Sequence, residues 1–448
     1  MRKNVDLING PIDKTLRQFT FPLAVSFIIN IVYAWVDLFY VGKLGETAVA
    51  ALGVSERIWF LTFAIGSGFA VGSGVILSRR IGENNKELAQ KTAAQSILAM
   101  FLLGVILSVL LYFFNGAILS LLGISGIVKQ QALEYFNGII IGISFNFMIF
   151  HIGMIMRSTG NSFYPMMILI GSNIINAILA PLFIFGIGPF PRWEIFGAGF
   201  GTSMSQFLGT IWALFLLIKK FKYFDELFKN FKIDLKEVFR IIKVGTPASI
   251  QMIAVSITSM GLAANANLFG TEVLSTFVIG LRIDLFINMS IFAFGAAMEI
   301  ISGQNIGAGK IHRIYQYYKS ALKHLAYVLI PLGVLSFFGG KYVGLLFTSN
   351  PITIEHLNVY LKFAAFNYLP FAVGIVSLRV ISGAGDYIRS LKIVVLILII
   401  IQLPVSYFAS HLLKSEIGIW VGMLFSMILF SFAAYRSMKS EKWLGKKV

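Results

Sequence analysis

The sequence predicts an all-α integral membrane protein. Of its 448 residues, 57% are hydrophobic and only 13% are charged, and the mean hydropathy is +0.81. Apolar runs recur along the chain at about the 20-residue length that a helix needs to cross a bilayer. Runs such as VVLILIII (394–401) do not alternate polar and apolar residues, as the strands of an outer-membrane barrel would. Because hydrocarbon offers the backbone no water, we expect helices.

Twelve apolar segments are separated by polar breaks, and we expect each to form one transmembrane helix. They lie at about 16–41, 48–77, 92–114, 130–156, 163–185, 195–218, 238–268, 273–302, 316–340, 354–378, 387–411 and 417–437. The polar start (1–15) leads directly into the first span. It lacks the short apolar region and cleavage site of a signal peptide, so we interpret it as a cytoplasmic tail.

The distribution of Lys and Arg predicts that both termini are cytoplasmic. With this topology, 29 of the 37 basic residues fall in cytoplasmic segments and 5 in outer segments, as the positive-inside rule requires. Cytoplasmic loops therefore explain the net charge of +17 without a nucleic-acid partner. We expect a multi-pass protein of the inner (cytoplasmic) membrane.

The two halves of the chain resemble each other at an offset of 225 residues. Phe21–Ala24 aligns with Thr246–Ser249, Arg57 with Arg282, and Gly160 with Gly385. We predict an N-terminal six-helix bundle (1–218), a basic cytoplasmic linker (219–237) and a C-terminal six-helix bundle (238–448). Six spans is an even number, so this is a parallel repeat, with a substrate site expected between the halves near the midplane.

The residue pattern does not indicate an enzyme or a bound cofactor. The chain has no cysteine and five scattered histidines without metal-ligand spacing. The glycines of GIGPFP (186–191) and GAGFG (197–201) lack the strand–helix context of a phosphate-binding loop. No ATP-binding motif appears, so we expect the energy for any transport to come from a gradient.

Asp37 interrupts the apolar run FPLAVSFIINIVYAWVDLFYVG (21–42). An ionised side chain near the bilayer centre costs at least ~2.5–3.5 kcal/mol. This acid must therefore be paired, protonated or in contact with water. Intramembrane acids usually have a function, and the alternative is a permanently bonded or protonated side chain that only joins helices.

Six short motifs carry a resemblance to a known family. They are VDLFYVGKLG (36–45), RRIGENNK (79–86), RSTGN (157–161), GAGFGT (197–202), SGQNIGAGK (302–310) and SGAGD (382–386). Over essentially its whole length the chain resembles the multidrug and toxic compound extrusion (MATE) family. The resemblance implies a V-shaped pair of six-helix bundles that exports amphipathic, often cationic drugs or toxins by alternating access.

The resemblance also implies roles for particular residues. An acid in span 1 takes part in cation coupling in that family, and Asp37 matches it. Many members place Asn-x-x-x-Asp in span 5, where this chain has Asn176 but Ala180 in place of the acid. With that acid missing, H⁺ is favoured over Na⁺; for Na⁺, Asp37 and Asn176 would be the metal ligands. A bend of span 1 at Pro22 on protonation is a further family property.

Helical spacing predicts which groups accompany Asp37. Asn30, Tyr33 and Asp37 fall at i, i+3 and i+7 and share one face. Asn173 and Asn176 begin the same spacing in span 5. If spans 1 and 5 adjoin, as in the family, these four polar groups could surround a carboxyl that takes up a proton in one conformation and releases it in another.

Two further acids lie in span 8. Glu299 is near the cytoplasmic end, where it could contact protons or a cationic substrate, or instead snorkel or pair with a lysine. Asp284 is near the outer end, where an ion pair with a neighbour such as Arg282 is the alternative to a second coupling site. Small residues in GSGFAVGSG (66–74) favour close helix packing.

The sequence leaves a second function open, that of a flippase for lipid-linked oligosaccharide or lipid. Such a protein should line its cavity with several basic residues, whereas few lie within the spans here, among them Arg57, Arg282 and Lys362. A cation-coupled antiporter is therefore the favoured prediction. We expect a monomer whose partners are small amphipathic organic substrates and membrane lipids.

Overall fold

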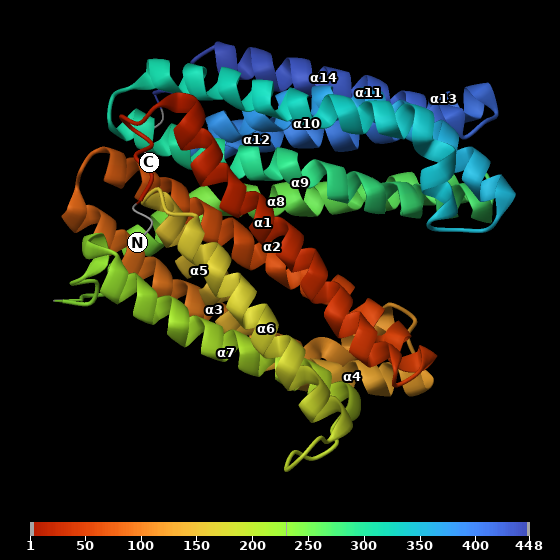
Figure 1. Ribbon diagram of the computed structural model, residues 1–448, viewed down its shortest axis with the longest axis horizontal. Coiled ribbons are helices and arrows are strands. Elements are labelled where there is room, and N and C mark those ends of the chain that lie inside the picture. The colour runs from red at the N-terminus through yellow and green to blue at the C-terminus, as the bar shows by residue number, and fades with distance from the viewer. Residues whose placement is uncertain (1–3, 230, 446–448) are drawn as a thin grey trace. The chain divides into compact units, whose positions relative to one another are not determined.

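The computed structural model describes residues 4–229 and 231–445, and its regular structure is helical (Figure 1). The elements are α1 (Ile12–Gly42), α2 (Glu46–Gly82), α3 (Lys86–Leu121), α4 (Gly126–Ile140), α5 (Ile143–Ser158), α6 (Phe163–Phe185), α7 (Glu194–Lys220), the 3₁₀ turn η1 (Lys222–Phe224), α8 (Leu235–Asn267), α9 (Thr271–Gly307), α10 (Ile311–Leu345), α11 (Pro351–Gly383), α12 (Tyr387–Val394), the π-helical η2 (Val395–Gln402), α13 (Leu403–Leu413) and α14 (Ile417–Lys439). Residues 1–3, 230 and 446–448 of the expected bundles and linker lie outside the described residues.

The helices confirm an all-α membrane protein. Eleven helices of the described chain are long and apolar enough to cross a bilayer, and there are twelve spans if α4 and α5 count as one. Those two helices are bent by 51°, so the span expected at 130–156 is broken near its middle. Helices α12 and α13 form one span with η2 between them, Tyr387–Leu413.

Helix boundaries keep the offset between the two halves. Helix α2 (Glu46–Gly82) corresponds to α9 (Thr271–Gly307), and both have 37 residues. The pair α4 and α5 covers the positions equivalent to the single helix α11, Pro351–Gly383. Equivalent positions of the two halves can therefore be compared residue by residue.

The chain forms two compact units. Of the described residues, the first unit comprises 4–5 and 25–249, and the second comprises 6–24 and 250–445. The division falls inside α1 shortly after Pro22, and inside α8 shortly after Pro247. The beginning of α1 therefore belongs to the second unit, and the beginning of α8 to the first.

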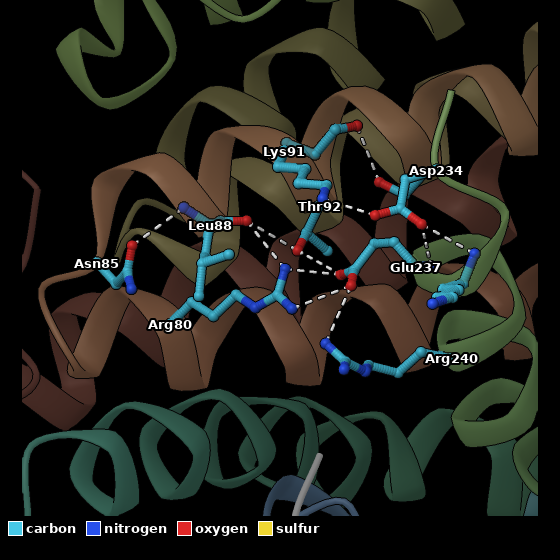
Figure 2. A network of polar contacts seen from close by, with 11 residues as sticks. Arg80, Asn85, Leu88, Lys91, Thr92, Asp234, Glu237 and Arg240 are labelled. Atoms are coloured by element: carbon cyan, nitrogen blue, oxygen red, sulfur yellow. Dashed lines mark hydrogen bonds and ion pairs between the residues drawn. The ribbon is translucent and has the colours of Figure 1, made fainter. Parts of the chain in front are cut away.

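A buried ion network fixes the beginning of α8 within the first unit (Figure 2). Arg80 Nη1 of α2 lies 2.6 Å from Glu237 Oε1, and the two side chains are 7% and 6% exposed. Thr92 Oγ1 donates to Glu237 Oε1 at 2.8 Å, and Arg240 Nη1 lies 3.0 Å from Oε2. Arg80 also donates to the carbonyl of Leu88 at 2.9 Å. The network thereby joins α2, α3 and α8.

Asp234 caps α8 beside this network. Its Oδ1 accepts hydrogen bonds from the backbone N–H groups of Lys236 at 2.9 Å and Glu237 at 3.2 Å, as an N-cap residue does. Lys91 Nζ lies 2.6 Å from Oδ2. The hydrogen bond from this ammonium holds the pKa of the Asp234 carboxyl below its ordinary value.

The second unit fixes the beginning of α1 at the equivalent place. Asn305, near the end of α9, donates to the carbonyl of Leu7 at 3.1 Å. Arg313, in the first turn of α10, donates to the carbonyl of Gly10. Each unit therefore holds the beginning of a helix whose remainder belongs to the other unit.

Candidate functional site

Asp37 lies where α1, α6 and α7 meet within the first unit. It is 7% exposed, and Thr202 Oγ1 of α7 donates to its Oδ2 at 3.4 Å. Asn176 Nδ2 of α6 donates to the same Thr202 oxygen at 3.0 Å. One turn beyond Asp37, Tyr40 Oη donates to the carbonyl of Ala177 at 3.3 Å, which ties α1 to α6.

Two glycines of α7 allow this junction to form. A Cβ atom on Gly197 would lie 2.5 Å from the carbonyl oxygen of Phe183, and one on Gly201 would lie 3.0 Å from Cα of Ala180. Because small residues let helices approach closely, α7 packs directly against α6. Thr202, which follows Gly201, is thereby placed beside the site.

Thr202 was missed by the sequence analysis. Its motif, GAGFGT, was used for its glycines and for the family resemblance, without a role for the threonine. The signal that could have found it was a hydroxyl directly after a small-residue face, at the depth of Asn176. The hydroxyl links the amide of Asn176 to the carboxylate of Asp37, so the two predicted residues meet through it.

Three buried oxygen atoms at this junction have no hydrogen-bond partner among the described residues. They are Asp37 Oδ1, Asn176 Oδ1 and Tyr33 Oη. Buried polar atoms are nearly always bonded, and each that is left unpaired costs about 1–3 kcal/mol. The carboxylate and amide oxygens are hydrogen-bond acceptors, so acceptor capacity at this junction is left unused by the described residues.

The other two predicted neighbours of Asp37 bind their own helices. Asn30 is exposed, and its Nδ2 donates to the carbonyl of Ser26 at 3.1 Å. Asn173 Nδ2 donates to the carbonyl of Leu169 at 2.8 Å. The structure thus joins Asn176 to Asp37 through a hydroxyl but shows no contact of Asn30 or Asn173 with the carboxylate among the described residues.

Glu299 of α9 belongs to a separate buried cluster in the second unit. It is 2% exposed, and Arg379 Nη1 of α11 lies 3.1 Å from its Oε2. Tyr387 Oη of α12 donates to Oε1. Of the roles considered for Glu299, the structure therefore shows an ion pair, made with an arginine at the end of a span and not with a lysine.

Asp284, also on α9, is bonded by two tyrosines of α11. Tyr360 Oη donates to Oδ2 at 2.6 Å, and Tyr368 Oη donates to Oδ1 at 3.2 Å. Arg282 is exposed, and among the described ion pairs none joins it to Asp284. The carboxylate thus points into the interface between α9 and α11.

Pro22, the expected hinge, lies inside α1. A proline within a helix has no N–H for the carbonyl four residues earlier and strains the preceding turn. This position is close to the residue at which α1 passes from the second unit to the first. Pro247 takes the same place in α8.

Comparison with known protein families gives matches in both halves of the chain. The family model described as MatE matches residues 22–182 and 247–408. The two matches begin at Pro22 and Pro247, which are equivalent positions of the internal repeat. Together they cover well over half of the chain.

Curated relatives match over most of their length. The probable multidrug resistance protein YoeA of Bacillus subtilis is 27% identical over 416 residues, which cover 91% of this chain and 89% of the relative. The multidrug export protein MepA of Staphylococcus aureus is 22% identical, with 95% and 93% covered.

A solved structure shares the fold. The Vibrio cholerae MATE transporter VcmN in its bent form has a TM-score of 0.90 at 21% identity, and the match covers 97% of this chain and 99% of that one. The fold of this chain is therefore matched over nearly its whole length.

Proposed function

Because the chain belongs to the MATE (MatE) family of transporters, we propose that it is a cation-coupled antiporter that exports amphipathic, often cationic compounds. The observation that carries this proposal is the buried carboxylate of Asp37, which accepts a hydrogen bond from Thr202 on Oδ2 and has no partner for Oδ1 among the described residues. The names of two relatives, a multidrug resistance protein and a multidrug export protein, support the class of cargo.

The coupling ion in this proposal is H⁺. A proton on Asp37 would turn an acceptor into a donor, and the unpaired Oδ1 of Asn176 is an acceptor in the same junction. A Na⁺ ion would draw on Asp37 and Asn176 as metal ligands and would prefer further hard oxygens. Ala180, where many family members have a second acid, supplies none.

The charges of the exchanged ions determine whether the pH difference or the membrane potential drives transport. One proton moving in for one monovalent organic cation moving out transfers no net charge, so the pH difference drives it. A tenfold proton gradient corresponds to about 1.4 kcal/mol and supports a tenfold cargo gradient. Neutral cargo would also use the membrane potential, at about 2.3 kcal/mol per 100 mV.

In this mechanism Asp37 is protonated in one conformation and deprotonated in the other. Cargo is bound while Asp37 is deprotonated. Pro22 is the proposed hinge of α1. Glu299 has a supporting role as a second contact for protons or cationic cargo. One chain contains both repeats, so a monomer is sufficient. In this proposal it lies in the cytoplasmic membrane with both termini in the cytoplasm.

Transport in reconstituted vesicles tests the proposal. We expect an imposed pH gradient to drive export of a fluorescent organic cation by the wild type but not by Asp37→Asn. The matched control is Glu46→Gln, which removes an exposed carboxylate at the beginning of α2 and should leave transport unchanged.

Three results would contradict parts of this proposal. Export driven by a Na⁺ gradient but not by a pH gradient would replace H⁺ by Na⁺ as the coupling ion. Full export by Asp37→Asn would remove Asp37 from coupling. Absence of drug export by the wild type under both gradients would favour a lipid or oligosaccharide flippase.

A further inference from the structure

The basic segment (219–243), which leads from the end of α7 into α8, carries positive charge that the proposed transport cycle does not use. It contains eight basic and four acidic residues. The described ion pairs engage every acid of the segment: Asp225 with Lys86, Glu226 with Lys229, Asp234 with Lys91, and Glu237 with Arg80 and Arg240 (Figure 2). Three of the four acids are thus neutralised by cations of α2 and α3, outside the segment.

The lysines of the basic segment are left without carboxylate partners. Six of them are exposed and belong to none of the described ion pairs: Lys219, Lys220, Lys222, Lys232, Lys236 and Lys243. Like charges gathered on one surface repel one another. An anionic partner would relieve that repulsion, so the charge of this surface favours one.

The beginning of α8 presents an apolar face beside its basic face. Helical spacing divides its first three turns into a buried, a basic and an apolar face. The buried face packs on α2, since a Cβ atom on Gly245 would lie 2.5 Å from the carbonyl oxygen of Gly68. The basic face is exposed and consists of Lys236, Arg240 and Lys243. The apolar face is exposed as well and consists of Leu235, Phe239 and Ile242.

The length of α8 places these two faces at the level of the lipid headgroups. Its 33 residues form a helix about 50 Å long, whereas the hydrocarbon core of a bilayer is about 30 Å thick. Part of α8 therefore extends beyond the core. All its charged residues lie between 236 and 243, so the part outside the core is its beginning. In the proposed topology this level is that of the cytoplasmic headgroups.

The combination of the two faces selects the partner. Nucleic acid or a soluble anion would meet the lysines but would leave the apolar face in water. An anionic phospholipid supplies both a phosphate for the ammonium groups and acyl chain for Leu235, Phe239 and Ile242. We infer that the basic segment binds the headgroups of anionic phospholipids, which hold the beginning of α8 at the membrane surface. The inference depends neither on the cargo nor on the coupling role proposed for Asp37.

Quenching of a fluorescent label by brominated lipid tests this surface in the full chain. The chain has no cysteine, so Ile233→Cys, at an exposed position between Lys232 and Asp234, provides one labelling site. In vesicles we expect brominated phosphatidylglycerol to associate with this position roughly fivefold more strongly than brominated phosphatidylcholine. The preference should decrease at about 1 M salt, where charges are screened within about 3 Å.

Two triple variants of the labelled chain each remove three positive charges. The first replaces lysines of the basic segment and combines Lys232→Gln, Lys236→Gln and Lys243→Gln. We expect it to lose the preference for phosphatidylglycerol. The control replaces exposed lysines of predicted outer segments and combines Lys43→Gln, Lys341→Gln and Lys414→Gln. We expect it to keep the preference, because the label reports only nearby lipid.

Several results would overturn the inference. They are equal quenching by the two lipids, no quenching by either, an unchanged preference in the first triple variant, and a loss of preference in both triple variants. Loss of the preference in inorganic phosphate, but not in chloride of the same ionic strength, would assign the surface to a soluble phosphate ligand instead. If the label on Ile233→Cys prevents folding, the same label on Phe239→Cys decides the matter. Vesicle transport by Asp37→Asn tests the proposed function separately.

Discussion

Replacing Glu237 by alanine is expected to destabilise the protein by about 3–5 kcal/mol. The substitution removes the partner of Arg80 in an ion pair of 2.6 Å whose side chains are 7% and 6% exposed. The guanidinium then keeps the carbonyl of Leu88 as its described partner. Breaking a buried pair by removing one member costs about 3–5 kcal/mol, because the other charge stays buried without compensation.

A double replacement distinguishes this cause from a general loss of packing. Arg80→Met combined with Glu237→Leu removes both charges and keeps apolar volume, and such replacements are often neutral or stabilising. The double variant should therefore recover most of the stability lost by Glu237→Ala. Glu226→Ala is the exposed control, because its ion pair with Lys229 has side chains that are 53% and 63% exposed.

The measurement is denaturant unfolding in mixed micelles, followed by far-UV circular dichroism, with the unfolding free energy obtained by linear extrapolation. With the single variants Arg80→Met and Glu237→Leu measured as well, the double variant completes a cycle that gives the coupling energy of the pair. A loss below about 1 kcal/mol for Glu237→Ala, the range of exposed pairs, would refute the reasoning. So would a double variant that is less stable than the single one.

Three further predictions follow from the described contacts. Thr202→Val keeps the shape of the side chain but removes its hydroxyl, so export driven by a pH gradient should fall at least tenfold. Thr202→Ser keeps the hydroxyl and should retain most of the export. Equal export by both variants would contradict the role of this hydroxyl in linking Asn176 to Asp37. Gly197→Ala puts a Cβ atom 2.5 Å from a carbonyl oxygen of α6 and should lower the free energy of unfolding by about 1–3 kcal/mol. The control is Gly53→Ala, whose Cβ atom meets open space and should not destabilise the chain in the same unfolding assay. The hydrogen bond from Lys91 lowers the pKa of Asp234 below its ordinary value of 3.8. The contribution of this carboxyl to stability is therefore complete above that pH and is lost only as the pH falls further. The pH profile of transport between about pH 6 and 8 should be the same in Asp234→Asn as in the wild type, and an altered profile would show that the reasoning is wrong.

The spans were predictable because bilayer thickness imposes a length on each apolar run. The fifth span was expected at 163–185, and α6 has those bounds. The break within the span expected at 130–156 was not predicted. At the break, Gly142 packs closely on α7, since a Cβ atom there would lie 2.6 Å from Cα of Ser203. Hydrophobic periodicity along one segment contains no information about such a contact.

The candidate site was predictable only in part. An acid inside an apolar run stands out in a sequence because its burial is costly, and Asp37 was found in this way. Helical spacing also placed Asn30 and Asn173 on suitable faces. However, spacing does not decide between a neighbouring helix and the carbonyl of the preceding turn, and both amides bind the latter. Thr202 could not be selected, because its position depends on how closely α7 packs on α6.

The hold of the second unit on the beginning of α1 has a consequence for biogenesis. Arg313, which binds the carbonyl of Gly10, is encoded 303 positions later in the chain. At ~5–20 residues per second, the ribosome needs roughly 15–60 s to produce it. During that interval the first segment to enter the bilayer lacks its final docking partner. The nascent chain must therefore keep this segment available until the beginning of α10, in the second repeat, has been synthesised.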